Sequence, residues 1–482
     1  MSSFRVAGSE LTGTATGTAT AAGARFRTGS PADTRPGPGA GRSRRTFAAS
    51  TAPAPAAPPG TAPASAARGQ ERRPGSPEPD FGPNVRVFGP ATPAAEIQAA
   101  LDAAARRQDA GGGFAFLFRP GTYDVDARLG SCTSIAGLGL SPDDVTINGA
   151  VRVEGRPQPG GGGGALTALP CSAENLAVGP ADGTGRWAVS QAAPPRRVHI
   201  RGQLLLPPRR GGSTSGGHTA DPAAGSGVVN ASQQPGPTRG STAAGRPDGV
   251  RDQIFRRFAG APGQPSPQPP CPAAPAAPVS REKPFLHLDA AGRYRVFLPA
   301  LRYGTADAGR SAGRVRGTSV PIEQFFVAKP ADSVVTLNRA LAQGKHLLLT
   351  PGVYRLTGTL KVTWSGTVVL GLGFPTLVPV TGAVAMRVEN VRGVRVAGLL
   401  FDAAGEEPPA LLEIGGRGRR SDPRDPTSVQ DVFFRVGAGG PGRTGNALVV
   451  GSDDVLIDHV RAWHADRPGA AAPVDVVRHP SP

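Results

Sequence analysis

The stretch FLFRPGTY at residues 116–123 returns as LLLTPGVY at residues 347–354, 231 positions later. In both copies an apolar run leads into a Pro-Gly turn and then a tyrosine. A second shared block follows, because SIAGLGL at residues 134–140 corresponds to VVLGLGF at residues 368–374. Apolar strand, turn, strand and Gly-x-Gly recur in one order, which indicates an internal duplication rather than a chance match of short motifs.

An amphipathic helix pattern precedes each copy. The first helix is predicted over residues 93–106, with Thr92 as its cap and Pro93 at its first helical position. The apolar positions that define the two helices are Ile97 and Leu101 before the first copy, and Leu337 and Leu341 before the second. We expect each helix to cover the first, otherwise exposed strand edge of its module.

Short strands separated by single Gly, Asn or Asp residues follow in both halves. The clearest are VRVAGLLFD, VFFRV and VLIDHV, which begin at residues 394, 432 and 455, at intervals of 38 and 23 residues. A β-sandwich is the alternative, but its hairpins would leave Asn-Gly or Asp-Gly turns about every 8–12 residues. A solenoid accepts loops of any length. The sequence therefore predicts an all-β fold of two tandem right-handed parallel β-helices of the pectin-lyase type, each with a short N-terminal capping helix.

Composition sets the expected domain boundaries. Residues 1–80 are rich in Ala, Gly, Pro and Thr without apolar periodicity, so they are predicted to be a disordered low-complexity region. The segments expected after it are a first β-helix at 81–205, a Gly/Pro-rich loop or linker region at 206–278, a connecting hairpin and linker at 279–325, a second, incomplete β-helix at 326–466 and a disordered tail at 467–482. Inside the connector, residues 285–288 and 294–298 should pair around the turn at 289–292.

Charge and cysteine content exclude several classes of protein. The formal charge is +17, but only four of the 53 basic residues are lysine and the arginines lack interleaved aromatic residues, so no nucleic-acid partner is expected. No apolar run reaches the roughly 18 residues of a membrane span, and no apolar N-terminal segment of a secretory signal is visible. Cys132, Cys171 and Cys271 lack zinc-ligand spacing, so neither metal nor cofactor is predicted.

Several blocks of the chain resemble secreted actinobacterial proteins related to glycoside hydrolase family 55. The blocks are SIAGLGLSPDDVTING at 134–149, RWAVSQA at 186–192, PVSREKPFL at 278–286, VVLGLG at 368–373 and VQDVF at 429–433. The resemblance implies tandem parallel β-helices in one chain, an inverting exo-β-1,3-glucanase activity and a substrate pocket between the two helices. It also implies an extracellular protein whose partner is a polysaccharide, and a monomer is expected.

Two residues match positions that the family uses to place the attacking water. The resemblance implies this role for Gln191 and for Ser215, which stands in a Ser-Gly-Gly segment. The alternative is that Gln191 is a strand residue that bonds a neighbouring coil and Ser215 an ordinary loop residue.

The family's catalytic acid is a glutamate late in the second β-helix, and this chain is expected to lack its counterpart. Inverting hydrolysis needs two carboxyl groups about 6.5–9.5 Å apart. The densest ionisable stretch contains Asp453 and Asp458, which are the candidate catalytic residues that remain. The alternative is that both are turn residues, because Asp side chains bond the local backbone where coils turn.

Two functions remain open on these grounds. The first is a carbohydrate-active β-helix protein that resembles inverting exo-β-1,3-glucan hydrolases but is truncated and inactive without the acid. The second is a non-catalytic β-helix that binds polysaccharide or acts as a surface interaction module.

Overall fold

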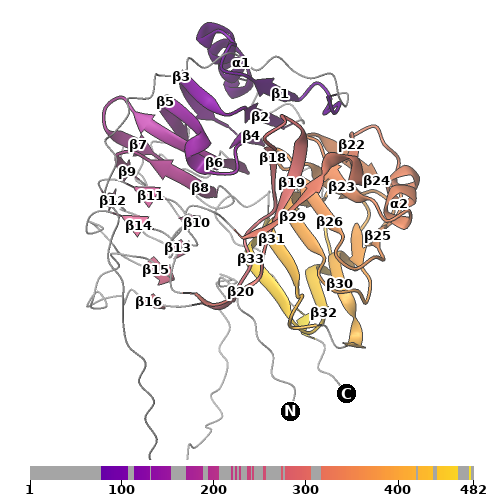
Figure 1. Cartoon of the computed structure of the whole chain (residues 1–482). Coiled ribbons are helices and arrows are strands. Elements are labelled where there is room, and N and C mark those ends of the chain that lie inside the picture. Colours follow the sequence, from indigo (N-terminus) through magenta and orange to yellow (C-terminus); the bar gives the residue numbers. More distant parts are fainter. Residues whose placement is uncertain are drawn as a thin grey trace, which may run out of the picture. The chain divides into compact units, whose positions relative to one another are not determined.

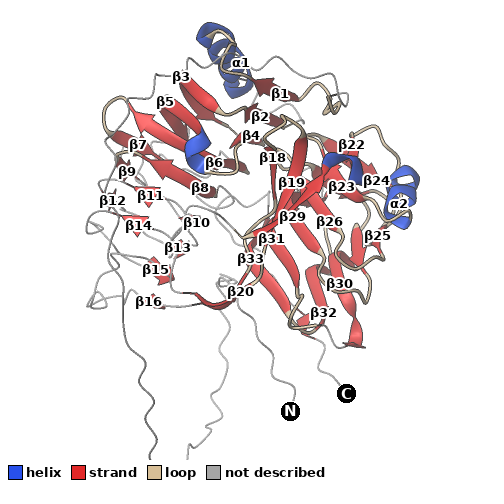
Figure 2. Ribbon diagram, in the orientation of Figure 1, coloured by secondary structure: helices blue, strands red, loops and turns tan. Residues whose placement is uncertain are grey.

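Parallel strands stacked on one another form both halves of the chain, and helices are few (Figures 1 and 2). The described residues all belong to one compact unit. The computed structural model describes residues 78–106, 113–130, 132–153, 170–187, 194–205, 219–220, 223–224, 227–229, 236–239, 242–243, 253–256, 273–274, 277–305, 316–419, 422–437, 442–464 and 477–478.

The N-terminal stack, residues 85–274, is built of coils that each supply strands to successive faces. The first face contains β1 (Val85–Phe88), β2 (Phe114–Phe118), β4 (Thr133–Gly137) and the first parts of β6 (Cys171–Pro180) and β8 (Pro195–Ile200), all parallel. The second face contains β3 (Gly121–Leu129), β5 (Val145–Val153) and the later parts of β6 and β8. The third face contains β7 (Thr184–Arg186), β9 (Gln203–Leu205) and β12 (Gly227–Val229).

Strands also occur in the region 206–278, which the sequence predicted to be loop. Besides β12, they are β10 (Thr219–Ala220), β11 (Ala223–Ala224), β13 (Gly236–Arg239), β14 (Thr242–Ala243), β15 (Gln253–Arg256) and β16 (Ala273–Ala274). They pair in parallel with β8 or with one another. The loop prediction is wrong at these strands, because short parallel rungs can continue a ladder through backbone hydrogen bonds without a strong apolar pattern of their own.

The C-terminal stack, residues 325–478, repeats the arrangement. Its first face contains β22 (Phe325–Ala328), β23 (His346–Leu349), β26 (Val368–Gly371) and the first parts of β29 (Arg395–Ala403), β31 (Thr427–Val436) and β33 (Val455–His464). The second face contains β24 (Val353–Leu356), β27 (Thr376–Pro379) and the later parts of β29, β31 and β33. The third face contains β25 (Leu360–Val362), β28 (Met386–Val388), β30 (Ala410–Arg419), β32 (Asn446–Ser452) and β34 (Val477–Arg478).

Both predicted helices are confirmed. α1 (Ala94–Arg106) buries Ile97 and Leu101, and α2 (Val334–Ala342) buries Leu337 and Leu341. Each lies at the start of its stack (Figure 1). The Ser333 hydroxyl caps α2 by accepting a hydrogen bond from the Thr336 N–H at 3.1 Å, which satisfies one of the unpaired donors of the first turn.

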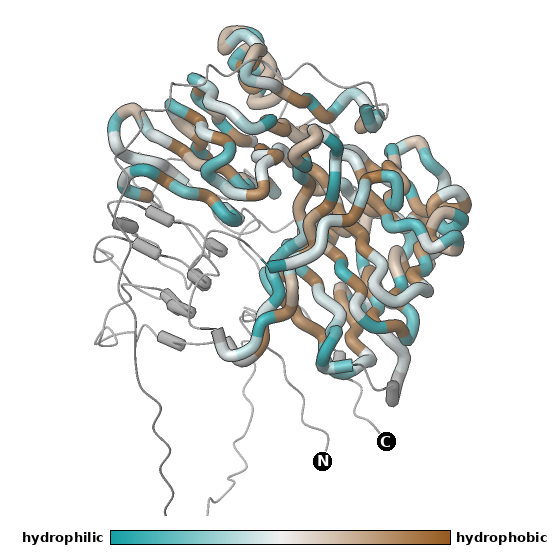
Figure 3. The backbone as a smooth tube through the Cα atoms, in the orientation of Figure 1, coloured by the Kyte–Doolittle hydropathy of each residue, from teal (hydrophilic) through white to brown (hydrophobic). Residues whose placement is uncertain are grey.

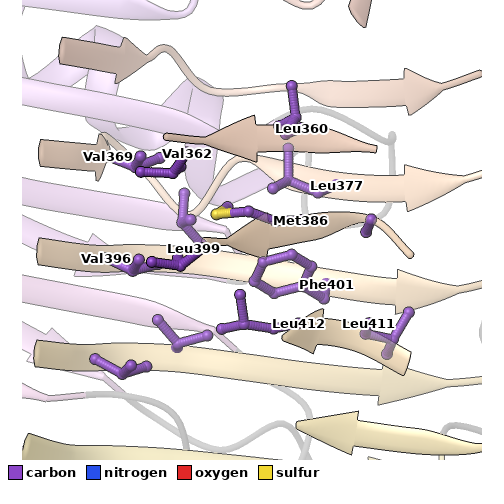
Figure 4. Close-up of a cluster of buried hydrophobic side chains, with 14 of the residues drawn as sticks. Leu360, Val362, Val369, Leu377, Met386, Val396, Leu399, Phe401, Leu411 and Leu412 are labelled. Carbon is purple, nitrogen blue, oxygen red and sulfur yellow. The ribbon is translucent and has the colours of Figure 1, made fainter. Parts of the chain in front are cut away.

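A dry apolar core fills the C-terminal stack. Side chains from its three faces point inward between the strands, as Figure 4 shows for Leu377, Met386 and Phe401, and hydrophobic residues run along the strands of both stacks in Figure 3. Phe401 stacks on Phe434 of the next rung with ring centroids 5.3 Å apart. Equivalent positions on successive rungs therefore pack on one another, which holds the parallel register.

The connector between the stacks is antiparallel. β18 (Phe285–Leu288) pairs with β19 (Tyr294–Pro299), so the predicted hairpin is confirmed. The other strands of the connector are β17 (Ala277–Ser280), β20 (Arg302–Thr305) and β21 (Gly317–Pro321). Short 3₁₀-helical turns occur at Pro142–Asp144 and Ile322–Gln324. An apolar seam joins the connector to both stacks, with Leu117 and Leu138 from the first, Leu286 and Val296 from the connector, and Leu348 and Leu370 from the second.

The predicted disordered ends are mostly outside the described residues. At residues 78–80, which are described, Glu78 forms an ion pair with Arg119 and Asp80 with Lys329. In the predicted tail, residues 477–478 form β34 and pair with β32. The prediction of disorder is wrong at these two places.

The duplicated sequence makes the same contacts in both copies. The Tyr123 hydroxyl donates to a carbonyl at the end of the preceding rung, that of Phe88, at 3.2 Å, and the Tyr354 hydroxyl donates to that of Ala328 at 2.8 Å. The turn glycines Gly121 and Gly352 have φ of +149° and +148°. These geometries explain why Pro-Gly-x-Tyr recurs, since it locks the first coil of each stack to the strand before it.

Replacing Gly352 by alanine should destabilise the protein. A Cβ at Gly352 would lie 2.3 Å from Cγ of Pro330, and the φ of +148° disfavours any L side chain. The expected loss in free energy of unfolding is about 1–3 kcal/mol, measured by urea denaturation. Gly358→Ala is the matched control, because its nearest neighbour is Cγ1 of Val334 at 3.8 Å. Equal stability of the two variants would contradict this explanation of the motif.

Candidate functional site

One corner of the C-terminal stack is lined by residues with left-handed backbone. Gly398, Asp431 and His459 have φ of +69°, +50° and +59°. They are aligned on consecutive rungs, because β29 pairs with β31 and β31 with β33 in register on both sides of each residue. Gly, Asp and His tolerate this conformation better than most residues, so the corner selects short or polar residue types.

The N-terminal stack has an equivalent corner. Asn175 and Arg197 have φ of +53° and +54° and lie on the successive rungs β6 and β8. The Asn175 amide donates to the carbonyls of Gly137 and Gly139 at 2.9 and 2.6 Å, and accepts from the Arg197 guanidinium at 3.0 Å. The corner is therefore held by side-chain hydrogen bonds to neighbouring rungs.

Arg196 connects the two corners. Its guanidinium donates to both carboxylate oxygens of Asp431, at 2.6 and 2.8 Å, and to Asp458 at 3.1 Å. Arg196 is 3% exposed and Asp431 0%. A bidentate contact of this kind fixes both the distance between the guanidinium and the carboxylate and the plane in which the two groups lie.

Lys283 adds a second connection. It lies in the connector segment before β18, forms an ion pair with Glu174 of β6, and has its ammonium nitrogen 3.6 Å from Asp431. Arg281 in the same segment donates to the Pro426 carbonyl at 2.6 Å and to Asp425 at 2.9 Å. The connector is thus bound to both stacks by buried charges.

His459 completes the group. Its Nδ1 lies 2.8 Å from Asp431 Oδ1, and its ring packs edge-on against Phe433 at 5.0 Å. We call Glu174, Arg196, Lys283, Asp431, Asp458 and His459 the interface charge cluster.

Burial and neighbouring charges determine the protonation of the cluster. Burial by itself would raise the pKa of Asp431, but the charge of Arg196, the hydrogen bond from His459 and the charge of Lys283 outweigh it and hold the pKa well below its usual value. Burial lowers the pKa of His459, and the contact with Asp431 only partly offsets this. Burial also lowers the pKa of the nearby Arg461 to about 10. At neutral pH Asp431 is therefore an anion and His459 is neutral, donating through Nδ1–H.

Two cavities lined by described residues of the cluster are too small for a sugar. One of about 30 Å³ is lined by residues that include Glu174, Asn175 and Lys283, and one of about 10 Å³ by residues that include Arg196 and Phe285. Ligand pockets usually measure about 300–1,000 Å³, whereas about 10–15 Å³ accommodates one water. As far as the described residues show, the cluster itself is thus a packed ionic contact.

A wider, open hollow of about 350 Å³ lies beside β1, at the start of the described chain. Its lining includes Glu78, Asp80 and Arg119. Hydrogen bonding to Lys329 lowers the pKa of Asp80. Both carboxylates are ion-paired, Glu78 with Arg119 and Asp80 with Lys329, and so tie the start of the described chain to the two stacks.

Comparison with known proteins identifies the family. Residues 325–477 match the model of the LAM55 pectate lyase-like domain. An exo-β-1,3-glucanase from Streptomyces sp. (strain SirexAA-E / ActE) is 44% identical over 393 residues, which are 80% of this chain and 64% of the relative. The structure of sacteLam55A from Streptomyces sp. SirexAA-E superposes with a TM-score of 0.75 at 44% identity, over 81% of this chain and 71% of that one. A variant of sacteLam55A in complex with glucose gives the same values.

The chain belongs to the Lam55 family. The resemblance to glycoside hydrolase family 55 inferred from sequence is thereby confirmed, together with a mainly β, pectate-lyase-like fold. The chain spans 64% of the length of the curated Lam55 relative that it matches.

The sequence-predicted site residues have different positions in this Lam55 structure. Asp458 lies in the interface charge cluster, paired with Arg196. Asp453 lies in the turn before β33, is partly exposed, and makes no ion pair with the described members of the cluster. Gln191 and Ser215 lie outside the described residues. Within the described part of the chain, no helix is long and apolar enough to span a membrane.

Sequence reasoning missed four charged members of the cluster, namely Glu174, Arg196, Lys283 and Asp431. One signal was present in the sequence. Lys283 is one of only four lysines and is followed by the apolar strand FLHL. A charge next to a buried strand indicates a paired, buried ion.

Lowering the pH should reduce the free energy of unfolding through His459 and Asp431 of this cluster. The folded pKa of His459 lies below its usual value, so below about pH 6.5 the unfolded chain binds a proton that the folded chain does not. The contribution of neutral His459 to the free energy of unfolding is complete above about pH 6.5. It is lost as the pH falls toward the lower pKa that His459 has in the folded chain. The contribution of Asp431 is present above about pH 3.9 and is lost as the pH falls further, toward its folded pKa.

The His459→Asn variant separates the pH range in which His459 affects stability from the lower range in which Asp431 does. Asparagine tolerates the left-handed backbone but cannot take up the proton, so between pH 5 and 6.5 its free energy of unfolding should depend less on pH, by up to about 1.4 kcal/mol per pH unit. Chemical denaturation at a series of pH values, referenced to pH 7.5, gives the slopes. Identical slopes for wild type and variant would rule out His459 as the source.

Proposed function

We propose that the chain forms part of an exo-acting β-1,3-glucan hydrolase that works outside the cell. The observation that carries this proposal is the 44% identity over 393 residues with an exo-β-1,3-glucanase. It is supported by the TM-score of 0.75 with sacteLam55A, a variant of which was solved in complex with glucose. The substrate we infer is a neutral β-1,3-linked glucan, and the protein acts as a monomer.

We infer that each stack is a right-handed parallel β-helix and that glucan binds in the groove between the two. Parallel crossover connections are right-handed in about 98% of cases, which supports the handedness. The three strand faces of each stack and the repeated Pro-Gly-x-Tyr contacts support the tandem arrangement.

Hydrolysis with inversion needs one protonated carboxyl group and one ionised carboxylate. Asp431 is held ionised by Arg196 and is therefore not suited to be the acid. Asp458 forms an ion pair with the same guanidinium. We propose that these two aspartates support the groove. The resemblance implies that Gln191 and Ser215 place the attacking water and that the proton donor of the relatives is a glutamate in their part beyond this match. Glucose release by this chain therefore requires one of its own carboxyl groups to donate the proton.

A non-catalytic role is the second candidate. The paired state of Asp458 favours it, because a glucan-binding module needs the groove and not a free acid. Glucose release and glucan binding therefore have to be measured separately.

The experiment is glucose release from laminarin by the full chain, with calorimetric titration of a laminarin oligosaccharide in parallel. If the hydrolase proposal holds, Gln191→Ala and Ser215→Ala should each lower turnover by about a hundredfold with little change in affinity, because they act on the water. Glu96→Gln, on the exposed side of α1, is the control and should leave both values unchanged.

Saturable binding without glucose release would establish the binding module instead. Neither binding nor release would refute both candidates. Equal turnover of Gln191→Ala and Glu96→Gln would remove the water-positioning role while leaving the activity itself.

A further inference from the structure

Asp431 contacts three parts of the molecule that are distant in sequence. Its carboxylate accepts hydrogen bonds from Arg196 of β8, 235 residues away, and from His459 of β33, 28 residues away. Lys283, from the connector, has its ammonium nitrogen 3.6 Å from the same carboxylate. A fully buried carboxylate with partners in the N-terminal stack, the connector and the C-terminal stack joins all three.

The cluster also spans two rungs in each stack. Glu174 and Arg196 are register partners on β6 and β8. Asp431 and Asp458 lie on the neighbouring strands β31 and β33. Arg196 contacts both rungs of the C-terminal stack directly, and Glu174 is linked to Asp431 through Lys283 of the connector. Several contacts of this kind resist sliding and rotation more than a single contact would.

We propose that Asp431 is a positioning residue: with Arg196 and Lys283 it clamps the two stacks at one orientation and thereby sets the width of the glucan groove. The groove belongs to the proposed function, and this part of the inference rests on it. The clamp itself concerns only the contacts between the stacks.

The apolar seam cannot perform this task alone. Hydrophobic association is non-directional and depends mainly on buried area, so Leu138, Leu286 and Leu370 specify the orientation of the stacks less sharply than a directional contact does. A bidentate guanidinium–carboxylate contact fixes two distances and a plane. The seam therefore supplies buried apolar area, and the charge cluster is a buried directional contact that adds to the Asp80–Lys329 ion pair and to the backbone hydrogen bond from Leu288 to the Leu138 carbonyl.

Desolvation explains why the clamp contributes orientation more than stability. Removing ions from water offsets much of the attraction between buried partners, so an intact buried ion pair adds little net stability. Removing one partner leaves a buried charge unpaired, which is costly. A test must therefore change the geometry while keeping the charge.

Arg196→Lys is such a change, because lysine keeps the positive charge but loses the planar fork that binds both oxygens of Asp431. Arg387→Lys is the matched control, since Arg387 pairs with Glu413 within the C-terminal stack at 2.6 Å. Asp431→Asn is a second variant, which keeps the shape and the left-handed backbone but removes the charge.

The primary measurement is the distance between two spin labels, one on each stack, in the full chain. Labels on p-acetylphenylalanine at Thr122 and Lys361, both exposed, leave the cysteines untouched. Arg196→Lys should give a broader distance distribution with a shifted mean, and Arg387→Lys the wild-type one. The affinity for a laminarin oligosaccharide should fall about tenfold in Arg196→Lys only.

Unchanged distributions in Arg196→Lys and Asp431→Asn would overturn the clamp, whatever the glucan data show. If Asp431→Asn does not fold, Arg196→Lys alone decides. A broadened distribution in a protein whose wild type binds no glucan would support the clamp and refute the groove, and with it the proposed function. A broadened distribution with unchanged glucan affinity would show that the clamp does not set the groove.

Discussion

The parallel backbone ladder is the constraint on which the rest of this structure depends. Each rung must align its N–H and C=O groups with the rung before it, so a corner on one coil has to sit over the corner of the next. That requirement places Gly398, Asp431 and His459 at one aligned corner with φ near +60°. Gly, Asn, Asp and His accept this backbone more readily than most residues, and two of these types, Asp and His, carry side chains that titrate. The ladder therefore also determines where charges can gather.

The charges at the corners are buried in the assembled structure and would be unfavourable there without partners. Asp431 is fully buried, and an unpaired carboxylate there would lose its hydration without compensation. Arg196 and Lys283 provide that compensation, and their charge keeps Asp431 ionised despite its burial. The two stacks thus complement each other chemically as well as in shape. The interface combines an apolar seam, which buries hydrophobic surface, with a directional ionic contact, which restrains the relative orientation of the two stacks.

The connector is an active part of this interface. The β18–β19 hairpin contributes Leu286 and Val296 to the apolar seam, and the segment just before it contributes Arg281 and Lys283 to the charged contacts. A link that only joined two domains would be expected to carry exposed polar residues. The glucan groove proposed for this Lam55 chain would depend on how the two stacks are held.

Local sequence patterns determined the duplication, both helices, the hairpin and the main strands of the second half, because periodicity and turn residues act over a few positions. The capping helix at 94–106 and β29, β31 and β33 follow from such patterns. The short strands between 219 and 274 did not, because their pairing rests on backbone bonds to other rungs and not on side-chain periodicity. Asp458 was recognised as a candidate but not as a partner of Arg196. Only the tertiary structure could bring Arg196 to Asp431, since a contact between residues 235 positions apart depends on where two separate ladders meet and leaves no local trace in the chain.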